Sequence, residues 1–194
     1  MQQHKVKPRK EEILDCAARL FREKGYKATS MRDIAKAVGI QGASLYNHIK
    51  SKQELLAALL LFIAHLFTKE MNKINKSPLP PVEKIERLIG LHVRYTAEHT
   101  DAISIITSEW VHLEEPVLSE YLGLRADYEK KFEKIIADCI KEGTFEKVNT
   151  RIALFSILST LRWLYSWYSN QKNIDPVELE QQMVHCLLTG LIKR

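Results

Sequence analysis

The sequence predicts an all-α protein of about nine helices. Apolar residues recur at intervals of three and four along almost the whole chain, as the buried face of a helix requires. The sequence lacks the alternation of apolar and polar residues that marks a half-buried strand. Seven glycines and six prolines in 194 residues also argue against a chain of many short strands and turns.

The first helix is predicted from Pro8 to about Lys24. Proline is favoured at the first position of a helix, and Gly25 follows where a C-cap glycine belongs. The residues of its buried face are Ile13, Leu14, Ala17, Leu20 and Phe21.

The stretch that follows predicts a helix-turn-helix. Ser30 is a good N-cap for a second helix, which Gly39 ends as a left-handed residue. Leu45 and Ile49 give a third, short helix its inner face. Ala35 is small where the two helices must approach each other. This spacing is typical of a motif whose second helix enters the major groove of DNA.

A long helix is predicted from Lys52 to about Asn75. Ser51 and Glu54 form a capping box at its start. The helix is apolar on more than one side between residues 55 and 67, so it must contact both the N-terminal part and the rest of the chain. We therefore expect it to link the two mechanically.

The remaining chain is predicted to be helical throughout. The expected helices are Val82 to His99, Asp101 to about His112, Pro116 to Gly143, Asn149 or Thr150 to about Tyr168, and a last helix from Asp175-Pro176 to about Leu191.

Charge is concentrated at the N-terminus. Residues 1–52 hold 12 Lys and Arg against 5 Asp and Glu, whereas the remaining 142 residues hold 17 against 19. A basic head on a nearly neutral body is typical of a DNA-binding domain joined to a second domain. The predicted division is a helix-turn-helix domain at 1–52 and a body domain at 53–194.

Several classes of protein are disfavoured. The N-terminus is basic and polar, unlike a signal peptide, and the apolar run at 55–67 is too short to cross a bilayer, so we expect a soluble cytoplasmic protein without a membrane partner. Glycine-rich phosphate loops and catalytic Ser-His-Asp or Cys-His arrangements are absent, and we expect neither an enzyme nor a cofactor. Three scattered cysteines are each expected to be buried apolar side chains.

The recognition helix is predicted at about Gly42 to Ile49, and its outward residues face the groove of DNA. Gln and Asn can bind adenine edges, and an alanine can contact a thymine methyl group. The expected groove residues are Gln41, Gly42, Ala43, Ser44, Tyr46, Asn47 and His48. The expected phosphate contacts are Thr29, Ser30, Arg32, Tyr46, His48 and Lys52, the last through its place at a helix N-terminus.

Aromatic side chains in the body predict either a pocket or ordinary packing in the core or a dimer interface. Arg125 lies on an otherwise apolar helical face and needs an anionic partner: Glu109, Glu98, another internal carboxylate or a ligand. His92 and His99 share a face and could meet a ligand or a metal, but Cys or carboxylate residues do not complete a metal-binding spacing, and we expect no metal site. The candidate ligand contacts are His92, Trp110, Tyr121, Arg125, Tyr128, Trp163 and Trp167.

The segment from about residue 13 to 56 resembles the TetR family of bacterial transcriptional regulators. The resemblance implies a homodimer that pairs through its last two helices, binds a palindromic operator in double-stranded DNA and responds to a small-molecule inducer. The residues that carry it are Phe21, Gly25-Tyr26, Thr29-Ser30, Ile34-Ala35, Val38-Gly39, Ser44-Leu45-Tyr46, His48, Ser51-Lys52 and Leu55.

The body resembles a branch of that family that responds to acyl-CoA thioesters and controls fatty-acid, steroid or aromatic-acid breakdown. The chain departs from that branch at Arg162, where the branch has Asn before Trp. The residues that carry the likeness are Leu124-Arg125, Tyr128-Glu129, Phe132, Glu142-Gly143, Phe145, Leu161-Arg162-Trp163 and Trp167-Tyr168.

These expectations combine into a dimeric, ligand-responsive repressor of catabolic genes, released from its operator by an acyl-CoA. Two alternatives remain at this point. One is a repressor of a drug-efflux gene whose aromatic pocket accepts lipophilic compounds, and the other is a helical protein that binds DNA constitutively and has no pocket.

Overall fold

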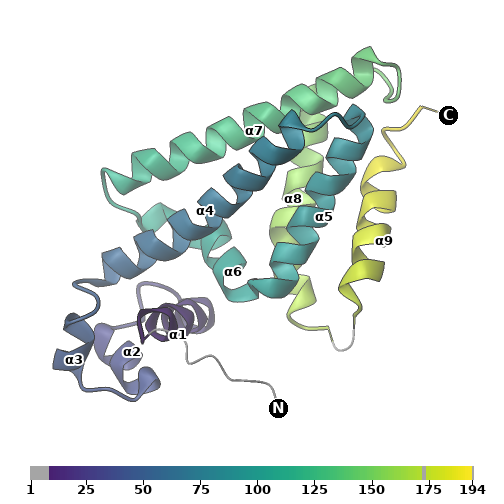
Figure 1. The fold of residues 1–194 in the computed structure, drawn as a ribbon. Helices are drawn as coiled ribbons and strands as arrows, with labels where there is room; N and C mark the ends of the chain where they lie inside the picture. Colours follow the sequence, from purple (N-terminus) through teal and green to yellow (C-terminus); the bar gives the residue numbers. More distant parts are fainter. Residues whose placement is uncertain (1–8, 172–173, 194) are drawn as a thin grey trace.

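The computed structural model describes residues 9–171 and 174–193, and in this part of the chain it confirms the all-α prediction (Figure 1). Nine α-helices and one short 3₁₀-helix, η1, occur within these residues. They are α1 (Arg9–Lys24), α2 (Met31–Val38), α3 (Gly42–Tyr46), α4 (Lys52–Lys76), α5 (Pro81–Glu98), α6 (Thr100–Ser108), η1 (Trp110–His112), α7 (Val117–Lys141), α8 (Thr150–Tyr168) and α9 (Pro176–Leu188).

Helices α1 to α3 form a compact head. Ser30 caps α2 as predicted, and its hydroxyl accepts from the Asp33 amide at 3.2 Å while the Asp33 carboxylate accepts from the Ser30 amide at 2.8 Å. Gly39 ends α2 with φ of 75°, a left-handed conformation that suits glycine. The recognition helix is shorter than expected because it ends at Tyr46, yet Ile49 in the turn after it is still fully buried.

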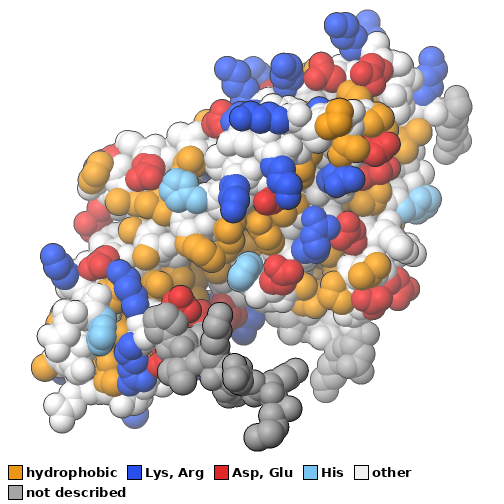
Figure 2. Space-filling model, in the orientation of Figure 1, with side chains coloured by type: hydrophobic (Ala, Val, Ile, Leu, Met, Phe, Trp, Pro, Cys, Tyr) orange, Lys and Arg blue, Asp and Glu red, His pale blue; other side chains and the backbone are white. Residues whose placement is uncertain are grey.

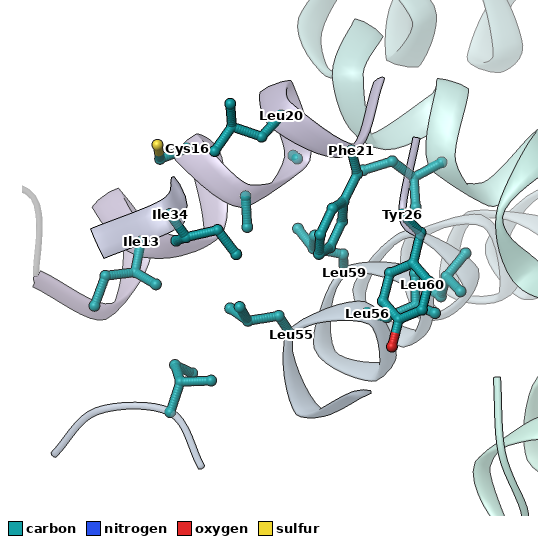
Figure 3. Close-up of a cluster of buried hydrophobic side chains, with 14 of the residues drawn as sticks. Ile13, Cys16, Leu20, Phe21, Tyr26, Ile34, Leu55, Leu56, Leu59 and Leu60 are labelled. Carbon is teal, nitrogen blue, oxygen red and sulfur yellow. The ribbon is translucent and has the colours of Figure 1, made fainter. Parts of the chain in front are cut away.

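Helix α4 belongs to two hydrophobic cores, as its apolar pattern predicts. Its first half carries leucines that pack against Phe21 and Tyr26 of the head (Figure 3). Its second half places Met71 and Ile74 in the core of the body. The cap at Ser51 differs from the expected capping box, since the Glu54 carboxylate accepts from the Lys50 amide at 2.8 Å.

In the body, the second half of α4 packs against α7 and α5, α8 packs against α5 and α7, and α9 covers the outer side of α5 (Figure 1). The predicted helix at 101–112 is broken, because the backbone at Glu109 turns between α6 and η1. The last helix ends at Leu188, three residues before the expected end.

Two further features bear on the sequence predictions. Cys16 and Cys139 are buried as expected, but Cys186, near the C-terminal end of α9, is exposed. None of the helices in residues 9–171 and 174–193 is long and apolar enough to cross a membrane.

Candidate DNA-binding face and ligand pocket

The outward side of α3 and its flanking turns is exposed. Six of the seven expected groove residues are solvent-exposed and Ser44 is partly buried, while Leu45 beneath them is fully buried. Basic side chains lie on the head at the lower left of Figure 2. The exposed groove residues are Gln41, Gly42, Ala43, Tyr46, Asn47 and His48.

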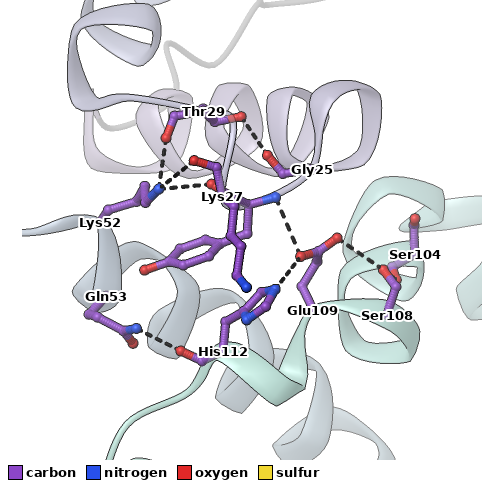
Figure 4. A network of polar contacts seen from close by, with 10 residues as sticks. Gly25, Lys27, Thr29, Lys52, Gln53, Ser104, Ser108, Glu109 and His112 are labelled. Carbon is purple, nitrogen blue, oxygen red and sulfur yellow. Dashed lines mark hydrogen bonds and ion pairs between the residues drawn. The ribbon is translucent and has the colours of Figure 1, made fainter.

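Ser30 and Arg32 are exposed, as phosphate contacts must be. The side chains of Thr29 and Lys52 are instead engaged within the head. The Thr29 side chain is only 1% exposed, and its hydroxyl donates to the Gly25 carbonyl at 2.9 Å, so it is not available to a phosphate. The Lys52 ammonium donates to the carbonyls of Tyr26 and Thr29 at 2.8 and 2.9 Å (Figure 4). Only the backbone amide of Lys52 is left for a phosphate.

A cavity of about 310 Å³ lies inside the body between α4, α5, α6, α7 and α8. Six of the seven candidate ligand residues line it. Trp167 is the exception, because it lies one turn further along α8 than Trp163, beyond the cavity. The lining candidates are His92, Trp110, Tyr121, Arg125, Tyr128 and Trp163.

The wall of the cavity that α7 provides is polar. Tyr121, Arg125, Tyr128 and Glu129 are spaced so that they share one face of that helix. The opposite walls are mainly apolar. They are formed by Ala64, Phe67, Ile103, Ile106, Trp110, Leu158 and Leu161. The cavity is therefore amphipathic and suits a ligand with one polar edge.

A shared carboxylate organises the charged part of this wall. Glu129 accepts from Arg125 Nε at 3.0 Å and also from Arg162 of α8. Burial alone would raise the pKa of Glu129, but the hydrogen bonds from Arg125 and Arg162 outweigh it and hold the pKa below its ordinary value. Two guanidinium groups share one carboxylate, so this cluster keeps one excess positive charge that can attract an anion.

Arg125 thus has another internal carboxylate as its partner, one turn away on its own helix. Its side chain is one-third exposed, and its guanidinium lies 5.5 Å from the centre of the Trp110 ring. Glu129 was not among the predicted site residues, although its place four residues after Arg125 is the spacing of a helical ion pair.

A neutral hydrogen-bonded pair forms the second polar part of the cavity. His92 Nε2 lies 3.0 Å from the Tyr128 hydroxyl oxygen. Burial, and then the charge of Arg162, lowers the pKa of His92 to about 3. Burial also raises the pKa of Tyr128. Both side chains are therefore uncharged at neutral pH. Groups of three or more side chains suited to a metal ion do not occur among the described residues.

The segment from α6 to η1 connects the cavity to the head. Trp110 lines the cavity. Beside it, the Glu109 carboxylate accepts from the Tyr26 amide at 3.3 Å and lies 3.6 Å from His112 Nε2 (Figure 4). The His112 ring stacks on Tyr26, and Gln53 of α4 donates to the His112 carbonyl at 2.6 Å. The segment from α6 to η1 therefore contacts both the turn after α1 and the start of α4.

A helix-turn-helix head joined by a shared helix to a body with an internal cavity defines a class of ligand-responsive DNA-binding regulators. A family model described as Bacterial regulatory proteins, tetR family, matches residues 13–59, and one described as Tetracyclin repressor-like, C-terminal domain, matches residues 78–191. The chain belongs to the TetR family.

Several relatives span nearly the whole chain. The HTH-type transcriptional repressor KstR2 of Rhodococcus jostii (strain RHA1) is 30% identical over 187 residues, which cover 94% of this chain and 91% of the relative. The structure of the ketosteroid transcriptional regulator KstR2 of Mycobacterium tuberculosis matches with a TM-score of 0.92 and 26% identity over 98% of both chains. A structure of AibR in complex with isovaleryl coenzyme A and operator DNA matches with a TM-score of 0.80 and 26% identity, over 92% of this chain and 97% of AibR.

Proposed function

We propose that this protein is a dimeric transcriptional repressor of catabolic genes that binds a palindromic DNA operator and releases it when an acyl-CoA occupies the body cavity. The observation that carries the inducer class is the amphipathic cavity, whose aromatic and aliphatic walls face a cluster with an excess positive charge. Such a cavity can bury an acyl group and attract the anionic part of a coenzyme A thioester.

The relatives support the same reading. KstR2 is named as a repressor and as a ketosteroid regulator, and the AibR structure contains both an acyl-CoA and operator DNA. In this proposal residues 1–52 form the DNA-binding domain, residues 53–194 bind the inducer and dimerise, and the protein acts without catalysis in the cytoplasm, where its operator is found.

DNA contacts are assigned to the exposed side of the head. The bases are read by Gln41, Gly42, Ala43, Ser44, Tyr46, Asn47 and His48. Phosphates are bound by Ser30, Arg32, Tyr46, His48 and the amide of Lys52. Base contacts specify sequence, whereas phosphate contacts only fix the register of the head on the duplex.

Release of DNA follows from the contacts between the cavity and the head. An inducer that displaces Trp110 shifts the neighbouring Glu109 and His112 against Tyr26, and α4 moves with them through Gln53. In a dimer this changes the separation of two recognition helices, which an operator with fixed half-site spacing tolerates poorly. Because coupling is reciprocal, operator DNA weakens inducer binding by the same factor.

The test begins with the melting temperature of the purified protein in the presence of a panel of acyl-CoA thioesters and the matching free acids. A true inducer raises the melting temperature in a dose-dependent way, and its free acid does not. The operator is then selected from random double-stranded DNA, and the same thioester should lower its affinity. A flat response to every thioester would refute the inducer class while leaving DNA binding untouched.

A further inference from the structure

The polar side chains of the cavity divide into two groups with different chemistry. Arg125, Glu129 and Arg162 form a charged group suited to an anion. His92 and Tyr128 form a second group that is uncharged and held together by one hydrogen bond. The cavity therefore offers a neutral hydrogen-bonding position in addition to its cationic one.

The neutral pair is enclosed by helices and aromatic rings. His92 comes from α5 and Tyr128 from α7, and the ring of Phe67 on α4 has its centre 4.5 Å from that of His92 and 5.8 Å from that of Tyr128. Tyr128 is buried and His92 is partly exposed, and both line the cavity. An unused hydrogen-bonding atom is costly in such surroundings, because little water competes there.

One hydrogen bond does not use up the capacity of this pair. If His92 Nε2 carries the proton and donates it, the hydroxyl hydrogen of Tyr128 is left for another acceptor. If the hydroxyl donates to Nε2 instead, the phenolic oxygen still has a lone pair for another donor. A hydrocarbon placed against the pair would leave this capacity unmet, whereas a carbonyl or hydroxyl oxygen would satisfy it.

We propose that the His92–Tyr128 pair recognises an oxygen substituent, carbonyl or hydroxyl, on the acyl group of the inducer. This inference rests on the proposed function, since it specifies the acyl group of the same ligand. The cavity of about 310 Å³ is near the lower end of the range for small-molecule sites, so it favours a compact acyl group over a long one. The inducer is then an oxygenated ring or short-chain acyl-CoA rather than a plain fatty acyl-CoA.

The experiment compares thioesters that share one carbon skeleton. Dissociation constants for the full chain are measured by calorimetry with cyclohexylpropanoyl-CoA and with each regioisomer of its ring-oxo and ring-hydroxy derivatives. We expect at least one oxygenated ester to bind about tenfold tighter than the parent ester, as one satisfied buried hydrogen bond allows. The oxo and hydroxy arms show whether the pair acts as donor or acceptor.

A variant isolates the pair. Tyr128→Phe keeps the ring and removes the hydroxyl, so we expect the ratio between the affinities of the oxygenated and parent esters to fall to within about twofold. If the Tyr128→Phe variant does not fold, Tyr128→Met, which also lacks the hydroxyl, is measured in its place. Tyr95→Phe is the matched control, because that hydroxyl belongs to a tyrosine that packs on Phe67 without lining the cavity, and the preference should persist.

The outcomes separate the two proposals. Equal binding of parent and oxygenated esters to the natural protein would overturn this inference and leave the acyl-CoA proposal standing. A preference that survives in Tyr128→Phe would overturn the assignment to this pair. Failure of every thioester to bind would overturn both the inducer class and the inference that depends on it.

Discussion

At the scale of single residues, Lys52 is a structural cation within the head. Its ammonium donates to the carbonyls of Tyr26, Lys27 and Thr29 in the turn before α2 and lies 4.2 Å from the centre of the Tyr26 ring. We expect Lys52→Ala to lower the free energy of unfolding by about 1–2 kcal/mol, because hydrogen bonds from a charged donor are lost. Urea denaturation measures this. Lys50→Ala is the control, since that exposed side chain makes no ion pair within the described residues, and equal stability of the two variants would contradict the prediction.

Asn47 gives a prediction about DNA sequence recognition. Its side chain is exposed at the end of α3, where an amide can bind an adenine edge with two hydrogen bonds. We expect Asn47→Ala to relax the preference at one base pair of the operator, at a cost of about 1–3 kcal/mol. Binding of the variant to the selected operator and to single-base variants measures this. An equal loss of affinity for operator and random DNA would show that Asn47 does not read a base.

His92 predicts how stability depends on pH. Its pKa is about 3 in the folded protein and about 6.5 when unperturbed, so the unfolded chain binds one more proton between these values. Stability is therefore lost as the pH falls through this window, by about 2 kcal/mol between pH 7 and pH 5. Urea denaturation at a series of pH values should show a shallower slope for His92→Gln. Identical slopes would mean that folding does not lower the pKa of His92.

Some residue placements follow from sequence and others do not. The inward positions of Leu45 and Ile49 follow from helical spacing, because the pattern is local. The bond between Glu129 and Arg162 joins α7 to α8 across 33 positions, and helical spacing carries no information about such a partner. Lys52 is a second example. Its phosphate contact was predicted from its position at the N-terminus of a helix, but its ammonium donates to a loop 23 to 26 residues earlier in the chain.

At the scale of elements, the segment from α6 to η1 is the proposed route of coupling between the cavity and the head. Glu109 holds this segment to the Tyr26 amide, and Trp110 beside it lines the cavity. We expect Glu109→Ala to keep inducer affinity within about twofold, yet to reduce the factor by which inducer weakens operator binding by about fivefold, a range typical of single coupling contacts. Fluorescence anisotropy of labelled operator with and without inducer measures that factor.

The control for this variant lies at the far end of the body. Glu146 is exposed and remote from the head, so Glu146→Ala should keep the full coupling factor. Unchanged coupling in Glu109→Ala would place the transmission in α4 alone, the helix that the sequence analysis identified as the link. The break between α6 and η1 was not evident from sequence, because the apolar spacing runs through Glu109 without a glycine or proline.

At the scale of the whole molecule, α8 has two apolar faces. The inner face, which includes Ile157, Leu158 and Leu161, belongs to the body core. The outer face carries Ile152, Phe155, Trp163 and Trp167, and the side chains of Phe155 and Trp163 are 71% and 62% exposed. An exposed stripe of this kind is typical of a surface that a partner subunit covers. It also explains why Trp167 was predicted to contact the ligand although it does not line the cavity. The spacing of apolar residues along α8 does not distinguish a pocket from an interface.

Dimerisation through this stripe gives a prediction that joins fold to function. Phe155→Glu places a charge in the middle of the apolar face, where pairing would bury it without a partner. We expect the variant to be monomeric by sedimentation equilibrium, to keep its helical content and to bind the operator at least about a hundredfold more weakly, because each head then binds its half-site alone. Leu122→Glu, at an exposed apolar position on α7, should stay dimeric. A Phe155→Glu variant that remains a dimer would place the subunit interface on another face of the body, and the spacing of the two recognition helices would then depend on elements other than α8 and α9.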